Sequence, residues 1–142
     1  MSDILLSEFS DGILTLTLNQ PELRNPISGS AAIDALCAAI EGADRDINCR
    51  VVIITGAGSA FSSGGDLTTM KLGGGLNDPS PANTRRNYRN GIQRLPLLFE
   101  SIEVPVIAAV NGPAIGAACD LTCMCDIRIA SEKAKFAESF VK

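Results

Sequence analysis

The hydrophobic pattern at the start of the chain predicts a pair of strands. Residues 4–9 and 13–18 are rich in apolar and β-branched side chains, and the Ser-Asp-Gly segment between them has the composition of a hairpin turn. The second run alternates strictly, with threonine between leucines. Its apolar face consists of Leu14, Leu16 and Leu18. This alternation is typical of a half-buried strand.

Further along, helical periods alternate with short apolar runs. Ser28 or Ser30 can cap a helix that ends near residues 42–46. Its apolar residues recur at helical spacing and are Ile33, Leu36, Cys37 and Ile40. Residues 51–55, 105–110 and 127–130 are predicted as core strands, the first of them covered on both faces.

The remaining pattern completes an α/β arrangement. Residues 84–102 predict a helix that Pro96 kinks or breaks, and residues 116–124 predict a helix rich in small side chains. Residues 134–136 have the composition of another strand. Because helices alternate with apolar strands, we expect crossover connections on a mainly parallel sheet flanked by helices, within one domain over residues 1–142.

Composition excludes several classes of chemistry. The 142 residues carry a net charge of −4 and no histidine. The charge argues against nucleic-acid binding, and the missing histidine excludes Ser-His-Asp and Cys-His nucleophiles and histidine-bound metal. The five cysteines lack zinc spacing, so no metal site is expected. No apolar run is long enough to span a membrane, and no secretory leader is recognisable, so we expect a cytoplasmic protein with reduced thiols.

Two glycine-rich turns, residues 60–67 and 111–120, each follow a predicted strand and lead into a helix. In such sheets ligands bind beyond the carboxyl ends of the strands, and helix N-termini present free N–H groups. A pair of these donors could hold a phosphate, a carboxylate or a developing oxyanion. Phosphate is the less favoured guest, because neither turn contains a Gly-Lys-Ser/Thr or Gly-x-Gly-x-x-Gly motif.

Five sequence blocks together resemble the crotonase (enoyl-CoA hydratase/isomerase) superfamily. The blocks are residues 18–21 (LNQP), 25–26 (NP), 61–67 (FSSGGDL), 106–112 (VIAAVNG) and 125–127 (CDI). The resemblance covers essentially the whole chain and implies the ClpP/crotonase ββα superhelix. Because members of that superfamily continue into further helices, it also implies a chain truncated at its C-terminus, with those helices missing.

The resemblance further implies a set of site residues. The backbone N–H groups of Gly65 and Ala117 correspond to the oxyanion hole, and Asp120 corresponds to the first catalytic carboxylate. Ala117 stands where relatives often have glycine, but alanine keeps the N–H. The residues that correspond to the acyl-CoA-binding wall and the adenine end are Leu23, Arg24, Ser63, Gly64, Asp66, Leu67 and Thr68.

One departure bears on the reaction. Phe140 occupies the position of the second acidic residue of hydratases, and the nearby Glu138 is expected to be an exposed loop carboxylate. Hydration needs two acid–base groups, whereas a single carboxylate can move a proton between two carbons. The expected activity is therefore double-bond isomerisation, or hydration, of an acyl-CoA thioester, with Asp120 as acid and base.

The same resemblance implies coenzyme A as part of the substrate, no other cofactor, and a homotrimer or hexamer for the complete protein. Three alternatives remain open. The chain is a non-catalytic acyl-CoA-binding relative, an acyl-CoA hydrolase or decarboxylase of the same fold, or a structural module whose uncovered face docks a partner. In the non-catalytic case, Asp120 merely caps its helix.

Overall fold

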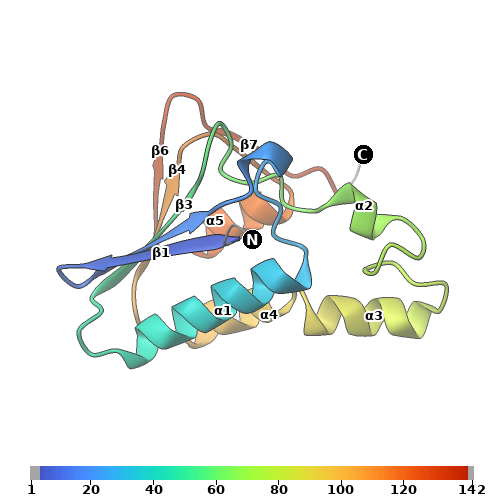
Figure 1. The fold of residues 1–142 in the computed structure, drawn as a ribbon, viewed down its shortest axis with the longest axis horizontal. Helices are drawn as coiled ribbons and strands as arrows, with labels where there is room; N and C mark the ends of the chain where they lie inside the picture. The colour runs from blue at the N-terminus through green and yellow to red at the C-terminus, as the bar shows by residue number, and fades with distance from the viewer. Residues whose placement is uncertain (1–3, 141–142) are drawn as a thin grey trace.

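The computed structural model describes residues 4–140 of the chain. Figure 1 shows a sheet against which helices pack on one side. The strands are β1 (Leu5–Ser10), β2 (Ile13–Leu18), β3 (Val51–Gly56), β4 (Val106–Val110), β5 (Pro113–Ile115), β6 (Ile127–Ala130) and β7 (Lys135–Ala137). The helices are the 3₁₀ turn η1 (Pro21–Leu23), then α1 (Ser30–Arg45), α2 (Leu67–Met70), α3 (Pro81–Asn90), α4 (Arg94–Ser101) and α5 (Ala117–Met124).

The main sheet has five strands in the order β1-β2-β3-β4-β6. Only the β1–β2 pair is antiparallel, so the prediction of a mainly parallel sheet is confirmed. The hairpin turn is also confirmed, because Asp11 and Gly12 have φ angles of 52° and 80°, and a type I′ turn needs two successive positive φ angles. A separate two-stranded sheet pairs β5 with β7. Residues 113–115 were not expected to form a strand.

The core lies between the sheet and α1, and the predicted apolar stripe of that helix is buried. Ile33, Leu36 and Ile40 have no exposed surface, and Leu16 opposite them has none either. The predicted cap is wrong, because Gly29 occupies the N-cap and no side chain caps the helix. The Ser28 hydroxyl instead accepts the Asp66 N–H at 2.8 Å.

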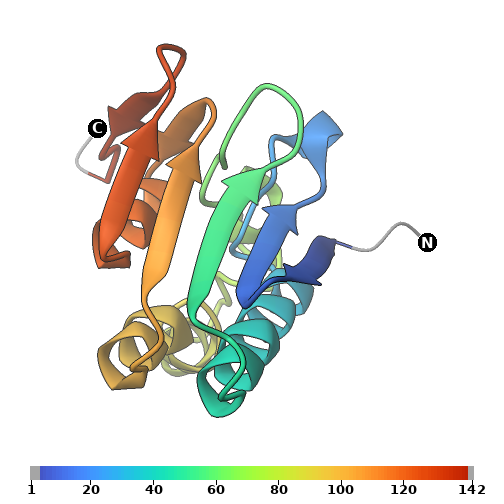
Figure 2. The same ribbon diagram turned by 90° about the vertical axis from the view of Figure 1, so that its left-hand side faces the viewer.

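Within residues 4–140, helices cover only one face of the sheet. The prediction that residues 51–55 form a strand covered on both faces is therefore wrong. Burial alternates along β3 and β4 rather than being continuous. All four residues of β6 are exposed, including Ile127 at 52% and Ile129 at 62%. Figure 2 views the open face, which no helix covers within residues 4–140. Valine and isoleucine occur on both faces of these strands, so their run gave no sign of which face was open.

The helical segment after the glycine-rich loop is broken, but not at the expected residue. It forms α3 and α4, and the break falls at Gly91, whose backbone leaves the helical region with φ −108° and ψ −116°. Pro96 lies in the first turn of α4, where a missing N–H removes no intrahelical hydrogen bond. Among residues 4–140 no helix is long and apolar enough to cross a bilayer.

Candidate active site

The first glycine-rich turn, which follows β3, is braced by a buried amide. Asn25 is 2% exposed, and its Nδ2 donates to the carbonyls of Ala57 at 2.9 Å and Ala60 at 3.0 Å. The Phe61 carbonyl accepts a third, longer bond of 3.3 Å from the same nitrogen. The Asn25 Oδ1 accepts the Gln20 N–H at 2.9 Å. This side chain therefore joins the loop after β2 to the turn, a role that its place in the NP block did not reveal.

The two glycine-rich turns meet at Gly64. This residue has a φ of +74°, and a Cβ built on it would lie 2.2 Å from the Ile115 carbonyl oxygen and 3.0 Å from the Ala117 nitrogen. Adjacent backbone bonds hold the junction, with Ile115 N–H donating to Ser62 O at 3.1 Å and Ile27 N–H donating to Gly64 O at 2.8 Å. Only glycine provides both this backbone conformation and this close approach.

Within residues 4–140, several backbone N–H groups beside this junction donate no hydrogen bond, among them those of Gly65, Ala117 and Ala118. Within residues 4–140, neither the Gly65 N–H nor the Ala117 N–H donates a hydrogen bond to the chain. Ala117 is the first residue of α5, where the N–H has no intrahelical partner, and Gly116 precedes it with a φ of 55°. Each turn therefore has an unused backbone donor next to the Gly64 junction, and the use of these two donors as an oxyanion hole stays a prediction.

Most of the predicted substrate-binding residues line one cleft of about 560 Å³. Its walls are Leu23, Pro26, Ser63, Gly65, Asp66, Leu67, Thr68 and Ile115. The large apolar side chains of Leu23 and Leu67 are 56% and 75% exposed. Arg24 lines an adjoining depression that shares Ser63 and Ile115 with the cleft. Gly64 lies in the packed junction behind the cleft.

Asp66 has a local structural role as well as its place in the cleft. Its Oδ1 accepts the Thr68 N–H at 2.8 Å and the Thr68 hydroxyl at 2.7 Å, which caps α2. These hydrogen bonds lower the pKa of the Asp66 carboxyl group, because they favour its charged form. Its own N–H is held by Ser28, so Ser28 is a further supporting residue that the sequence did not identify as such.

Asp120 and Ala117 share a second, smaller cavity of about 160 Å³. The other lining residues are mostly apolar and are Ile92, Gln93, Leu95, Pro96, Leu121 and Met124. Burial raises the pKa of the Asp120 carboxyl group, and the negative charge of Glu138 and a hydrogen bond with it raise it further. The structure therefore separates the predicted residues into a cleft on one side of the Gly64 junction and an acidic cavity at α5.

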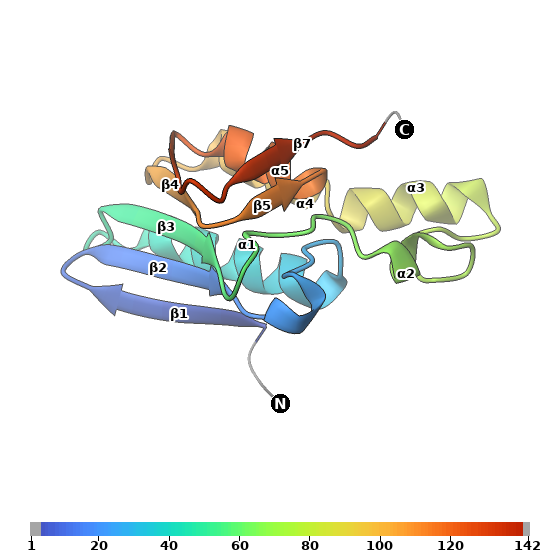
Figure 3. The ribbon, with the colours of Figure 1, turned by 90° about the horizontal axis from the view of Figure 1, so that it is seen from above.

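Glu138 and Phe140 both lie near the start of α5. The Gly116 N–H donates to the Ala137 carbonyl at 2.8 Å, which fixes the chain at the end of β7 beside that helix. Figure 3 shows β5, β7 and α5 lying together. The Phe140 ring lies 3.8 Å from the position that a Gly116 Cβ would take. Glu138 is exposed, as expected, and its charge acts on Asp120 and raises the pKa of that carboxyl group, which was not expected.

Within the described residues, no group of three or more Cys, Asp or Glu side chains is placed to hold a metal ion. The reactive features are thus two free N–H groups, a half-buried carboxyl group and an open cleft with apolar rims. Backbone N–H groups without a partner in the fold can stabilise negative charge on a ligand, and a carboxyl group can take up or release a proton.

Comparison with known proteins identifies the family. The sequence profile of the enoyl-CoA hydratase/isomerase family matches residues 8–142. The chain is 36% identical to a probable enoyl-CoA hydratase of Mycobacterium tuberculosis, over 99% of this chain and 52% of that protein. It is also 36% identical to the 1,2-epoxyphenylacetyl-CoA isomerase of Escherichia coli, over 100% of this chain and 53% of that protein.

A solved structure gives the same result. The enoyl-CoA hydratase/isomerase from Xanthobacter autotrophicus Py2 superimposes with a TM-score of 0.84 at 34% identity, covering 97% of this chain and 49% of that one. The chain belongs to the enoyl-CoA hydratase/isomerase family and has the crotonase fold, so both the resemblance and the predicted fold class are confirmed. It spans about half the length of the curated relatives it matches.

Proposed function

We propose that this protein is an acyl-CoA-processing enzyme of the enoyl-CoA hydratase/isomerase class, which stabilises a thioester enolate between the N–H groups of Gly65 and Ala117. The observation that carries the proposal is the pair of unused donors on either side of the Gly64 junction. Both residues are partly exposed, and neither N–H has an acceptor within the described residues, so both can donate to a ligand bound beside the converging turns.

Asp120 is the acid–base group of the proposed reaction. In isomerisation its carboxylate takes a proton from C2 of a 3-enoyl thioester, and the electron pair moves onto the thioester oxygen that the two N–H groups hold. The resulting carboxylic acid returns the proton to C4, which leaves the double bond between C2 and C3. A raised pKa suits this role, because an acid–base group works best when its pKa approaches the working pH.

The substrate is a coenzyme A thioester that enters without any additional cofactor. Its acyl carbonyl lies at the Gly64 junction, and the cleft with rims at Leu23 and Leu67 takes the neighbouring pantetheine arm, with Arg24 toward the adenine end. A homotrimer or hexamer in the cytoplasm is the expected setting of the complete enzyme, by analogy with the family. Among the relatives, the name of a Danio rerio protein places it in mitochondria.

Both isomerisation and hydration have support among the relatives. Two relatives are each 36% identical to this chain, and one is named a hydratase and the other an isomerase. An acyl-CoA hydrolase or decarboxylase could use the same oxyanion hole. Phe140 favours the non-catalytic alternative, an acyl-CoA-binding relative, because this residue stands in the place of a second acid.

The experiment is a calorimetric titration of the chain with crotonyl-CoA, together with the absorbance of the conjugated enoyl group and a parallel assay with 3-butenoyl-CoA. The Asp120→Asn variant should bind normally and lose turnover by about 10²-fold or more. Asp11→Asn is the matched control, because it makes the same change at the exposed hairpin turn. Binding without turnover of either thioester would establish the non-catalytic alternative, and absence of binding would refute the proposal.

A further inference from the structure

The acidic cavity follows one face of α5. Four of its lining residues recur at helical spacing on that helix and are Ala117, Asp120, Leu121 and Met124. Residues three and four apart lie on the same side of a helix, and the rise per residue places Met124 about 10 Å along the axis from Ala117. The cavity therefore extends from one proposed oxyanion-hole donor, past the proposed acid–base group, to the last turn of α5.

The opposite wall comes from the start of α4, which packs against α5. Its residues are Ile92, Gln93, Leu95 and Pro96. Leu95 is 1% exposed and Leu121 is fully buried, so the inner walls belong to the packed core and yield little. The cavity volume of about 160 Å³ is close to that of an engineered apolar cavity of about 150 Å³ that holds a benzene ring. The space therefore accommodates about six carbon atoms.

The charge of the cavity is negative. Asp120 is its one charged lining residue among the described residues, and the remaining side chains are apolar apart from Gln93. A second carboxylate placed here would lose its water beside a like charge and gain no cationic partner.

The arginines nearest in sequence to the lining residues are engaged elsewhere. Arg94 follows Gln93, but its guanidinium donates to the Asp34 carboxylate on α1. Arg128 lies at the C-terminal end of α5, where it donates to backbone carbonyls, among them that of Cys125 at 2.8 Å. Neither side chain lines the cavity, so neither offers a charge to the end of a bound acyl group.

We propose that the acidic cavity selects uncharged, apolar acyl groups of about six carbon atoms and rejects groups of the same length that end in a carboxylate. This inference rests on the proposed function and deepens it, because it names the acyl groups that the site accepts. With the thioester oxygen at the Ala117 N–H, C2 to C4 lie beside Asp120 and the remaining carbons extend toward Leu121 and Met124. Met124 is the lining residue farthest along α5, so its side chain limits the accepted length.

The first test compares two saturated thioesters in calorimetric titrations of the chain as it exists. Hexanoyl-CoA ends in a methyl group and adipyl-CoA, with the same number of acyl carbons, ends in a carboxylate; neither has a double bond to react. Hexanoyl-CoA should bind about 10²-fold more tightly, because the carboxylate is desolvated without a partner. Equal affinities, or tighter binding of adipyl-CoA, would overturn the selectivity and leave the proposed function intact. Binding of neither thioester would refute the proposed function as well.

The second test supplies the missing cation with Gln93→Lys. Gln93 is an exposed residue at the rim, and an ammonium group there gives a terminal carboxylate a partner. The variant should bind adipyl-CoA about 10-fold more tightly than the wild-type chain does and hexanoyl-CoA within about twofold.

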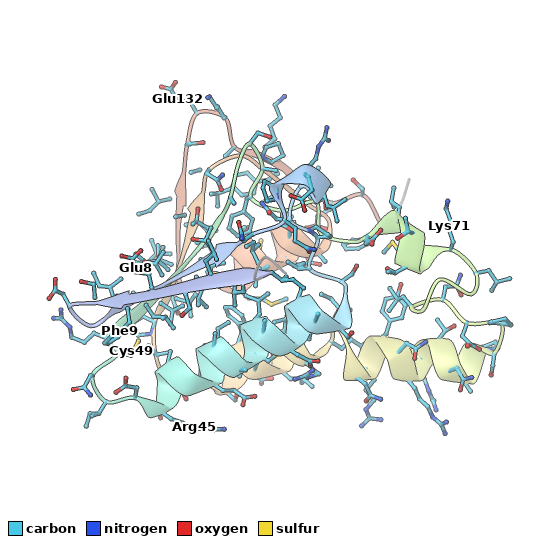
Figure 4. The ribbon with its side chains drawn as sticks, in the orientation of Figure 1. Glu8, Phe9, Arg45, Cys49, Lys71 and Glu132 are labelled. Atoms are coloured by element: carbon cyan, nitrogen blue, oxygen red, sulfur yellow. The ribbon has the colours of Figure 1, made fainter. Side chains whose placement is uncertain are left out.

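Glu132→Gln is the control for overall charge. It raises the net charge by the same amount, but Glu132 is exposed at the tip of the β6–β7 loop and points away from α5 (Figure 4). Since salt screens exposed charges, the control should keep the wild-type ratio of the two affinities. A control that shifts the ratio as much as Gln93→Lys, or a Gln93→Lys variant with the wild-type ratio, would overturn the selectivity of the cavity.

The third test concerns length. Met124→Ala removes the Cγ, Sδ and Cε atoms from the far end of the cavity, so decanoyl-CoA should bind about 10-fold more tightly than it binds to the wild-type chain. Met124→Leu, which fills a similar volume, should keep the wild-type preference for hexanoyl-CoA. If Met124→Ala also keeps that preference, Met124 does not limit the length of the acyl group.

Discussion

Gly64→Ala is the substitution that tests the junction of the two turns most directly. At a φ of +74°, an L-residue costs about 1–2 kcal/mol relative to glycine. The new Cβ would lie 2.2 Å from Ile115 O, whereas ordinary contact begins at 3.4 Å. The turns must therefore separate by about 1 Å, and the displacement falls on the segment that carries the Ala117 N–H.

The control variant Gly73→Ala separates the cost of the backbone conformation from the cost of the steric clash. Gly73 has nearly the same backbone conformation, with a φ of +78°, but nothing lies within 4 Å of its Cβ position. We expect Gly73→Ala to lower the free energy of unfolding by about 1–2 kcal/mol and Gly64→Ala to lower it by about 3 kcal/mol or more. The difference between the variants is the steric term, and urea unfolding of both measures it.

The same two variants also test how the junction affects substrate binding and turnover. A misplacement of about 1 Å between catalytic groups can cost about 10²-fold in rate. Gly64→Ala should therefore weaken crotonyl-CoA binding and turnover, while Gly73→Ala leaves both unchanged. If Gly64→Ala matches Gly73→Ala in stability and keeps wild-type affinity, the two turns do not depend on their close approach, and the account of the oxyanion hole fails.

Two further predictions concern the brace and the acidic cavity. Asn25→Asp keeps the shape and the left-handed backbone of the residue but turns a carboxylate toward three carbonyl oxygens. Urea unfolding at neutral pH should therefore show a free energy of unfolding about 3 kcal/mol lower than that of the wild-type chain. A decrease under about 1 kcal/mol would contradict the bracing role. The raised pKa of Asp120 means that the folded state retains its proton better than the unfolded chain does. Its stabilising contribution is full below the ordinary value of 3.8 and is lost as the pH rises through the folded pKa. The stability of Asp120→Asn relative to the wild-type chain should therefore increase between acidic and neutral pH, and a pH-independent difference in urea unfolding would count against the shift.

Local pattern alone predicted those features that depend on neighbouring residues. The alternation in β2, the apolar stripe of α1 and the turn chemistry at Asp11-Gly12 are set by side-chain period and by backbone preference, both of which act within a few residues. The glycine-rich blocks at 61–67 and 111–120 likewise indicated where donors would be presented. The resemblance of these blocks to a family then implied the roles proposed for Gly65, Ala117 and Asp120.

Tertiary structure decided which segments meet and which faces are covered. A run of valine and isoleucine contains no information on whether a helix packs over both sides, so the prediction that residues 51–55 are covered on both faces was wrong. The first turn of α4 accommodates Pro96, and the chain breaks at Gly91 instead. Glu138 becomes a neighbour of Asp120 because β7 pairs with β5, a contact between residues 18 positions apart in the sequence that depends on the crossover between them. Such long-range placement follows from packing and strand pairing across the whole fold, which no local period records.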